Sequence, residues 1–359
     1  MANDPIIEET FDKSSIADLV AQHGSSSATA WLEFDRYKIW RPTKDIPESS
    51  FRPVQGYMRK DPYLYAWGNP LVSDSTALRP TATAFQEWAD SQNLRLIWSC
   101  VDHELEQVLA EPPFEWSCVS CIYEDVVDPA HVVELTGPEA VGKQGGASVV
   151  KDLKKNLKRA DKQDVHVTEV TKQQWSDEDK KAVEQGIIDW KKSKSGVQIA
   201  STTLQPWLDQ GHRRYWLAKK DDTVIGVLIL TPIQNHAWQI KNAVSFPNAP
   251  KGTSEKLIFT ALRDLNCEQQ ENGTPQSERV TVTFGISAAD ELHPVKNLSG
   301  WKVTAMSKIY GTVTQAAGLL RRSEFRSKFD SGHDPMYVCY PGDGFNLEGV
   351  NTLLKLLKK

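Results

Sequence analysis

The segment from Phe246 to Ile258, FPNAPKGTSEKLI, joins a tight turn to the start of a helix. Two prolines, an asparagine and a glycine favour the turn, while Thr253 and Ser254 are N-cap residue types and Glu255 falls in the first helical turn. Apolar, strand-like runs precede the turn. A strand, a glycine turn and a helix N-terminus together offer free backbone N–H groups to an anion. We expect Gly252, Thr253 and Ser254 to bind a phosphate-bearing donor or a developing oxyanion, with a purely structural turn as the alternative.

The segment KDLKKNLKRADK predicts a strongly basic helix, expected over 147–162. Leu153 and Leu157, four residues apart, can hold one face on the core while the cations occupy the other. Because the net charge of the chain is −5, polyanion binding has to come from such a local patch. We expect this helix to bind a phosphate backbone, with a solvated helix face as the alternative. Its cations are Lys151, Lys154, Lys155, Lys158, Arg159 and Lys162.

The segment from Leu319 to Tyr340 alternates cations with aromatic residues. We expect it to form a cationic wall opposite the helix start at Gly252, where a lysine holds a phosphate or stabilises an oxyanion. The alternative is an amphipathic helix end followed by a loop into a strand. The residues concerned are Arg321, Arg322, Arg326 and Lys328, interleaved with Phe325 and Phe329.

Other catalytic motifs are missing from the sequence. Cys118 and Cys121 form a CxxC without a second pair, and residues three apart on a strand point to opposite faces, so a core role is favoured over zinc. HExxH, GxSxG, GxxxxGK[ST] and GxGxxG do not occur. We therefore expect no metal and no cofactor. Five scattered cysteines, no signal peptide and no apolar run of about 20 residues predict a cytosolic protein, with peripheral membrane contact as an open alternative.

The alternation of strand and helix patterns predicts an α/β (α+β) fold. We expect strands at 30–35, 56–67, 95–101, 116–127, 165–170, 214–219, 224–232, 238–246, 280–286 and 335–339. Helices are expected at 16–23, 82–92, 105–110, 147–162, 177–192, 254–269, 306–320 and 347–359, and a loop at 137–146. The two halves have a similar order of elements, which predicts two related domains, 1–163 and 164–359. Twelve tryptophans would also suit a cleft for a large apolar ligand.

The order of these segments resembles the C-terminal catalytic region of bacterial lysylphosphatidylglycerol synthase, the multiple peptide resistance factor family. Its APxG turn opening a helix corresponds to NAPKG here, and its basic helix to KDLKKNLKRADKQ. WGNP at 67–70, FGISAA at 284–289 and FRSKF at 325–329 match further elements, so the resemblance spans about 56–340. It implies two tandem GNAT-like acyltransferase domains that move an amino acid from a charged tRNA to a lipid hydroxyl.

Free-standing fungal relatives of that family make ergosteryl-glycine, and this sequence includes neither a flippase nor a synthetase domain. The resemblance therefore implies glycyl-tRNA as donor, the 3-hydroxyl of ergosterol as acceptor, and contact with sterol-containing membranes. A phospholipid aminoacyltransferase and a CoA-dependent acyltransferase of the same fold are the alternatives. A peptide ligase that uses charged tRNA and a non-catalytic tRNA- or lipid-binding protein are more distant ones.

The resemblance also suggests residue roles. Where the bacterial pattern has Asp and Arg on the strand before the APxG turn, this chain has Lys241 and Val244, which argues against lysine as the transferred group. We expect Lys328 to stabilise negative charge, the basic helix to hold tRNA, and the donor to contact Lys241, Arg322 and Arg326 together with the Gly252 turn. The general base is left open among His236, Glu255 and Asp330.

Overall fold

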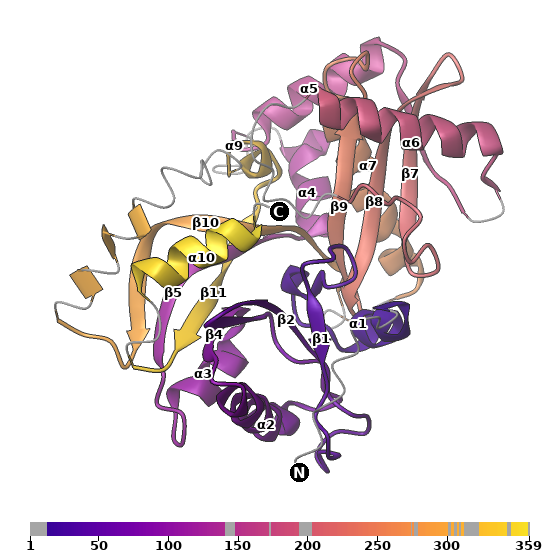
Figure 1. Ribbon diagram of the computed structural model, residues 1–359. Coiled ribbons are helices and arrows are strands. Elements are labelled where there is room, and N and C mark those ends of the chain that lie inside the picture. The colour runs from indigo at the N-terminus through magenta and orange to yellow at the C-terminus, as the bar shows by residue number, and fades with distance from the viewer. Residues whose placement is uncertain are drawn as a thin grey trace.

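The computed structural model describes residues 13–357 except 141–147, 172–173, 194–202, 274, 276–278, 301–302, 305–306, 309, 312–322 and 343–345. Across these residues eleven strands form one sheet, in the order β1-β2-β3-β4-β11-β5-β10-β9-β8-β7-β6 (Figure 1). In that order they are Lys38–Trp40, Gln55–Lys60, Tyr63–Trp67, Arg95–Val101, Gly332–Tyr340, Ser117–Val127, Thr281–Lys296, Ala237–Ser245, Thr223–Gln234, Arg214–Lys220 and His166–Glu169.

The C-terminal strand β11 returns to the first half of the sheet. It lies between β4 and β5 and runs antiparallel to both. Figure 1 shows it beneath helix α10 (Leu347–Leu357), whose Leu353, Leu356 and Leu357 pack against the core there. The division into 1–163 and 164–359 stays a prediction; the pairing of β11 adds a strand from the end of the chain to the first half.

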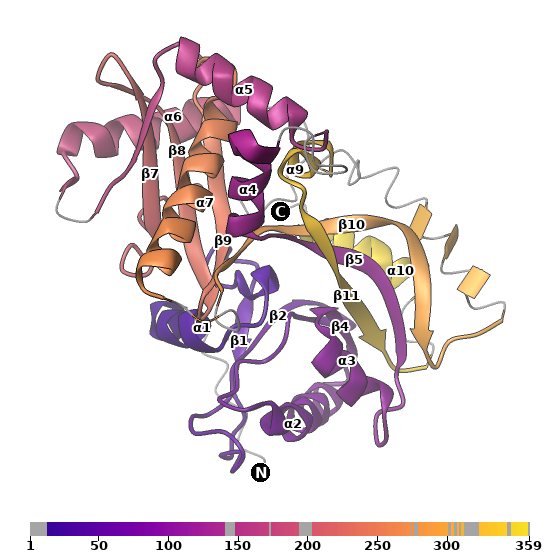
Figure 2. The ribbon, with the colours of Figure 1, turned by 180° about the vertical axis from the view of Figure 1, so that it is seen from behind.

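The sheet splits between β9 and β10. These strands run parallel over only three residue pairs, from Thr281 with Ala237 to Thr283 with Gln239. Gly285 then takes a φ of +88°, and a register shift against β5 follows Thr283. Glycine is the residue that adopts this backbone conformation without a steric penalty. From there β10 curves away along β5 (Figures 1 and 2).

Helices cover both faces of the sheet. Helices α4 (Pro129–Thr136), α5 (Lys151–Lys162) and α7 (Thr253–Glu271) bury one apolar core against β7–β10, and α6 (Asp177–Lys192) covers the other face of β7–β9 (Figure 2). In the first half, α2 (Leu78–Ser91) and α3 (His103–Ala110) pack on one face, with α1 (Ala17–His23) and α10 on the other. The result is a three-layer arrangement around the sheet.

Local sequence signals explain several of these helix boundaries. Asp102 and Asp128 cap α3 and α4 through their carboxylates, and Pro129 occupies the first turn of α4. Ser176 caps α6, whose first turn is acidic and whose last turn is basic, so its charges complement the helix dipole. The basic helix begins at Lys151 rather than at 147, with the expected Leu153 buried in the core.

Two sequence expectations about the first half are corrected. The strand predicted over 30–35 is wrong, because this segment forms turns after the short helix Ser27–Thr29. Individual side chains of this segment still pack in the core. Trp31 is fully buried, and its indole N–H donates to the carbonyl of Trp67 at 2.9 Å. The run predicted as one strand over 56–67 is the hairpin β2–β3. Most of the helix predicted over 306–320 lies outside the described residues.

Candidate functional site

Two sequence-predicted catalytic residues meet in one ion pair. Lys328 Nζ lies 2.8 Å from Glu255 Oε1, and the amide of Asn156 on α5 donates to the same oxygen at 2.8 Å. The ammonium also lies 4.9 Å from the ring centre of Phe325, which packs with Phe329. The Lys328 side chain is 26% exposed and that of Glu255 is 9% exposed. The pair is thus largely buried, at the junction of α5, α7 and the short helix Ser327–Phe329.

The glycine turn before α7 is closed by the basic helix. Gly252 has a φ of +96°, and a Cβ added to it would lie 2.2 Å from the carbonyl oxygen of Asn156. Gly252 and Thr253 are buried, and the hydroxyl of Thr253 donates to the carbonyl of Pro250. Glycine is therefore required here for a close helix approach. Of the three residues expected to present N–H groups, only Ser254 is partly exposed, and anion binding by them stays a prediction.

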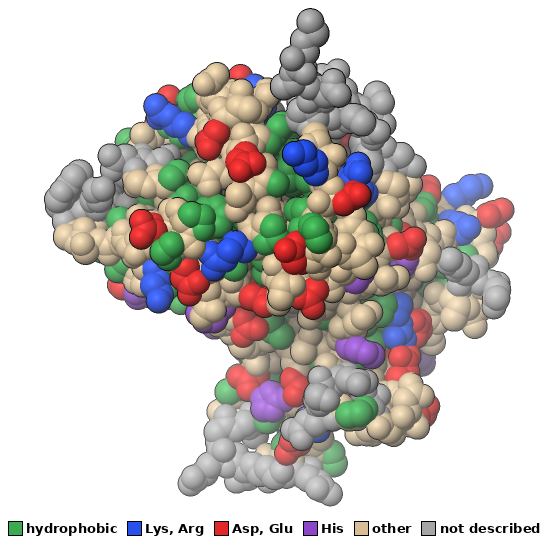
Figure 3. All heavy atoms as spheres, turned by 90° about the horizontal axis from the view of Figure 1, so that it is seen from below, with side chains coloured by type: hydrophobic (Ala, Val, Ile, Leu, Met, Phe, Trp, Pro, Cys, Tyr) green, Lys and Arg blue, Asp and Glu red, His purple; other side chains and the backbone are tan. Residues whose placement is uncertain are grey.

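The cations of α5 lie next to this ion pair. Lys256 on α7 joins the two helices, because its Nζ lies 2.7 Å from Asp161 Oδ1 near the end of α5. All the expected cations are exposed except Lys154, which is half-buried; the exposed ones are Lys151, Lys155, Lys158, Arg159 and Lys162. The face seen from below in Figure 3, away from α5, carries acidic and basic side chains interspersed. Arg159 Nη1 donates to Asn156 Oδ1 at 3.2 Å, which connects one of these cations to the ion pair.

Lys241 occupies an irregular position on β9, beside the split. Asn242 pairs with Ile229 and Ile240 pairs with Leu230, so Lys241 is an extra residue in this strand. Such β-bulges re-aim a side chain and are common next to active sites. Beyond Gln239 the edge of β9 has no ladder partner on the β10 side within the described chain. The bulge at Lys241 thus lies beside the place where the sheet opens.

The environment of Lys241 is buried and poorly satisfied. Lys241 is 3% exposed, and its Nζ has no hydrogen-bond partner among the described residues. Desolvation lowers the pKa of Lys241 to about 8, against the attraction of Glu33. Gln239 is also buried without side-chain hydrogen bonds, and Glu33 forms a buried ion pair with Arg213. A cavity of about 20 Å³ touches Lys241, Gln239 and Glu33, which is space for about one water molecule.

A second buried polar cluster lies on β5, opposite the split. Asp125 is fully buried and accepts from Ser287 Oγ at 2.9 Å, from His333 Nδ1 at 2.6 Å and from Arg326 Nη1. Arg326 also donates to the carbonyl of Gly285, which lies just beyond the last β10 residue that pairs with β9. Arg326 was expected to bind substrate. The residue is 8% exposed, and its Nη1 links the carboxylate of Asp125 to the Gly285 carbonyl of β10.

The neighbouring carboxylate on β5 faces the other way. Glu124 accepts from the backbone N–H of Ser27 and, at 2.5 Å, from Thr283 Oγ1. Burial raises the pKa of Glu124, while these donors and Arg326 act in the opposite direction. Glu124 thus fastens the start of β10 to the N-terminal segment.

Of the other expected catalytic residues, His236 lies apart from this ion pair, whereas Asp330 directly follows the short helix of Lys328 and has a different partner. His236 is in the turn that begins β9, whereas Gly252 follows the end of that nine-residue strand, a separation of about 30 Å along the sheet. Asp330 pairs with His131 Nε2 at 2.8 Å and is partly exposed. Arg322 lies outside the described residues. Sequence reasoning missed Asp125, Glu124 and His333, because their proximity depends on how β11 and β10 pair with β5.

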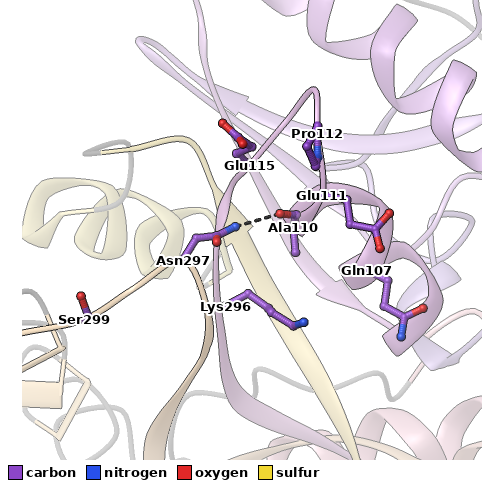
Figure 4. Close-up of a pocket in the computed structure, with 8 residues that line it drawn as sticks. All are labelled: Gln107, Ala110, Glu111, Pro112, Glu115, Lys296, Asn297 and Ser299. Atoms are coloured by element: carbon purple, nitrogen blue, oxygen red, sulfur yellow. Dashed lines mark hydrogen bonds between the residues drawn. The ribbon is translucent and has the colours of Figure 1, made fainter.

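A separate polar groove lies at the far end of β10. It has a volume of about 740 Å³ and is lined by the end of α3, the following loop and residues Lys296, Asn297 and Ser299 (Figure 4). The Asn297 amide donates to the carbonyls of Ala110 and Trp116, which fixes the groove wall. The groove shares no residue with the ion pair of Lys328 or with the split.

Within the described chain, no helix is long and apolar enough to cross a membrane. In the same part of the chain, no group of three or more His, Cys, Asp or Glu side chains is arranged to hold a metal ion.

Solved structures similar to this one include L-PGS from Bacillus licheniformis, with a TM-score of 0.70 and 12% sequence identity over 99% of this chain and 98% of that chain. The C-terminal domain of a putative lysylphosphatidylglycerol synthetase from Agrobacterium fabrum matches with a TM-score of 0.67 and 15% identity, over 95% and 94% of the two chains. A conserved protein of unknown function from Bacteroides thetaiotaomicron matches with a TM-score of 0.57 and 8% identity, over 94% and 100%. At such identities the likeness shows the fold alone.

No protein-family model matches the sequence, and no curated protein sequence matches it either. GNAT proteins, one of them a tandem GNAT protein, are among the weaker structural matches. The α/β fold class expected from the sequence is confirmed, and its division into two tandem GNAT-like units stays a prediction.

Proposed function

We propose that this protein transfers an amino acid from a charged tRNA to the hydroxyl group of a lipid, with glycyl-tRNA as donor and ergosterol as acceptor. The observation that carries the proposal is the direct contact of a cationic helix with a candidate reaction site. Helix α5 packs against the start of α7, and its Asn156 shares an oxygen of Glu255 with Lys328. The fold likeness to L-PGS over nearly the whole chain supports the same reaction class.

The chemistry suits such a site. The aminoacyl ester of a charged tRNA is already activated, so the protein has to orient the two substrates, exclude water and stabilise the developing oxyanion. Cations along α5 would hold the phosphates of the tRNA. Lys328 would stabilise the negative charge that develops on the carbonyl oxygen, and its ion pair with Glu255 orients its ammonium group.

Two features support a small, uncharged transferred group. Lys241 is a buried cation beside the split, and it would repel a cationic side chain. The cavity that Lys241 lines is small, about 20 Å³. Glycine meets both conditions. Ergosterol as the acceptor rests on the sequence resemblance, and contact with sterol-containing membranes follows from the choice of that acceptor.

The proposal is tested by incubating the purified protein with a pool of charged tRNAs and a total lipid extract, followed by mass analysis of the new lipids. We expect ergosteryl-glycine to appear only when charged tRNA is present. Aminoacylated phosphatidylglycerol in its place would assign the protein to phospholipid modification. Acyl transfer from CoA without tRNA would contradict the proposal.

A further inference from the structure

We propose that His333, held by the buried carboxylate of Asp125, is the proton-transfer group of the reaction. This inference rests on the proposed function, since it assigns a role within aminoacyl transfer to a lipid hydroxyl. The sequence leaves the general base open among three other residues, and the structure separates one of these, His236, from the Gly252 turn.

The geometry is that of an oriented imidazole. His333 Nδ1 lies 2.6 Å from Asp125 Oδ1, and no hydrogen bond to its Nε2 is found among the described residues. A carboxylate that accepts from Nδ1–H fixes the tautomer in which Nε2 has a free lone pair. Asp125 is fully buried, whereas the His333 side chain is 50% exposed. The carboxylate is therefore fixed inside the protein while the free nitrogen is open to a substrate.

His333 is connected both to Lys328 and to the place where β10 separates from β9. Lys328 lies in the short helix Ser327–Phe329, and His333 is the second residue of β11, which begins at Gly332. Asp125 is joined through Arg326 to the carbonyl of Gly285, where β10 leaves β9. His333 and Asp125 are paired residues of neighbouring strands, and Val127, two residues along β5, belongs to the core beneath α7. The imidazole thus points to the face of the sheet on which α5, α7 and Lys328 lie.

The other groups around His333 fit this role. The ring of Tyr123 on β5 lies 5.5 Å from the imidazole, centre to centre, and Ser287 on β10 shares the Asp125 oxygen. Arg326 on α9 (Ser323–Arg326) neutralises Asp125 from its other oxygen. The second histidine–carboxylate pair near β11, His131 with Asp330, has a carboxylate that is 38% exposed and therefore less firmly held.

His333 would carry one proton from the acceptor hydroxyl to the ribose oxygen in two stages. Nε2 of His333 takes the proton of the acceptor hydroxyl as the acceptor oxygen bonds to the ester carbonyl carbon. When the tetrahedral intermediate collapses, the bond from that carbon to the ribose oxygen breaks, and Nε2 returns the proton to the ribose oxygen. The products are the new lipid ester and an uncharged tRNA. Asp125 is a positioning residue in this scheme, since it acts through the imidazole.

The test compares the wild-type protein with His333→Gln, His333→Gly and the control His166→Gln in glycine transfer between pH 5 and 8. His166 is a suitable control because it is an exposed histidine on the edge strand β6 and, like His333, it pairs with an aspartate, Asp164. We expect His333→Gln to lower kcat by about 10²- to 10⁴-fold with little change in KM, and to remove the loss of rate at acidic pH. Added imidazole should restore part of the activity of His333→Gly. The control should behave as the wild type.

The outcomes separate this inference from the function on which it rests. If the wild-type protein transfers no amino acid to any lipid, the proposed function fails and this role fails with it. If the wild-type protein is active and His333→Gln keeps its rate and pH profile, only the role of His333 is wrong. A loss that is equal at every pH and is not rescued by imidazole would also overturn the role, because it would indicate a structural effect. A larger loss in His131→Gln would move the role to His131.

Discussion

Lys328 Nζ and Glu255 Oε1 lie 2.8 Å apart, so two residues separated by 73 positions in the sequence form one ion pair. The side chains of the pair are only partly accessible to solvent, 26% for Lys328 and 9% for Glu255. Because Asn156 on the basic helix donates to the same oxygen, the position of α5 and the orientation of Lys328 are physically linked.

Replacement of Lys328 tests the role of its charge. Lys328→Ala should lower turnover by about 10²- to 10³-fold, the scale for losing one electrostatic stabiliser. Lys328→Arg should recover activity only in part, because a guanidinium has a different geometry. The matched control is Lys256→Ala, which removes another α7-associated ion pair, that with Asp161. Steady-state kinetics with charged tRNA is the measurement. Full turnover of Lys328→Ala would show that the site is elsewhere.

The cations of α5 should dominate tRNA affinity. The double change Lys155→Glu with Lys158→Glu reverses two exposed charges, and it should weaken tRNA binding and reduce the slope of log K against log salt by about 2. The control reverses the same number of charges on the opposite side of the second half, Lys181→Glu with Lys191→Glu on α6. Binding is measured by filter retention at several salt concentrations. Equal weakening by both variants would mean that only net charge matters.

Gly252 should be essential for packing α5 onto α7. Gly252→Ala combines a positive φ with a contact of 2.2 Å to the Asn156 carbonyl, so we expect a loss of at least about 2 kcal/mol in the free energy of unfolding. Gly273→Ala is the matched control. Gly273 also has a positive φ, +60°, but nothing lies within 4 Å of an added Cβ, so only about 1 kcal/mol should be lost. Urea unfolding of both variants gives the comparison. Equal losses would show that the helix contact is unimportant.

Lys241 should make stability depend on pH. Its pKa in the folded protein is about 8, below the usual 10.5, so the unfolded chain binds the proton more tightly. Burial of the charge therefore destabilises the fold fully below about pH 8, and this cost is relieved as pH rises from about 8 to 10.5. The difference between the two pKa values corresponds to about 3 kcal/mol. Lys241→Met should therefore be more stable than the wild type at pH 7, and the gap should close near pH 10.5. An unchanged gap across this range, measured by urea unfolding, would show that Lys241 is not a buried cation.

Most of the element pattern could be predicted because it depends on local signals. Helix α6 was expected at 177–192 and is found there, since a serine cap, an acidic first turn and a basic last turn mark both of its ends. The turn at Gly252 was also expected, although its close contact with Asn156 was not. The sequence cannot show that contact, because it joins positions almost one hundred residues apart.

The candidate site was predictable only in part. Glu255 and Lys328 were both named, since each stands in a segment with an unusual composition. The dyad of Asp125 and His333 was missed, although His333 lies in the 319–340 segment, because their contact is created when β11 inserts beside β5. The role of Arg326 differs for a similar reason, since Asp125 and the carbonyl of Gly285 come together only at the split of β9 and β10.

The most direct test of the account is transfer of labelled glycine from purified glycyl-tRNA to ergosterol by the purified protein. The account predicts that the label enters the organic phase as ergosteryl-glycine, with uncharged tRNA released in equal amount. Lys328→Ala and His333→Gln should slow this transfer, and the Lys256→Ala and His166→Gln controls should not. The absence of labelled lipid with ergosterol, with phosphatidylglycerol and with a total lipid extract would contradict the account.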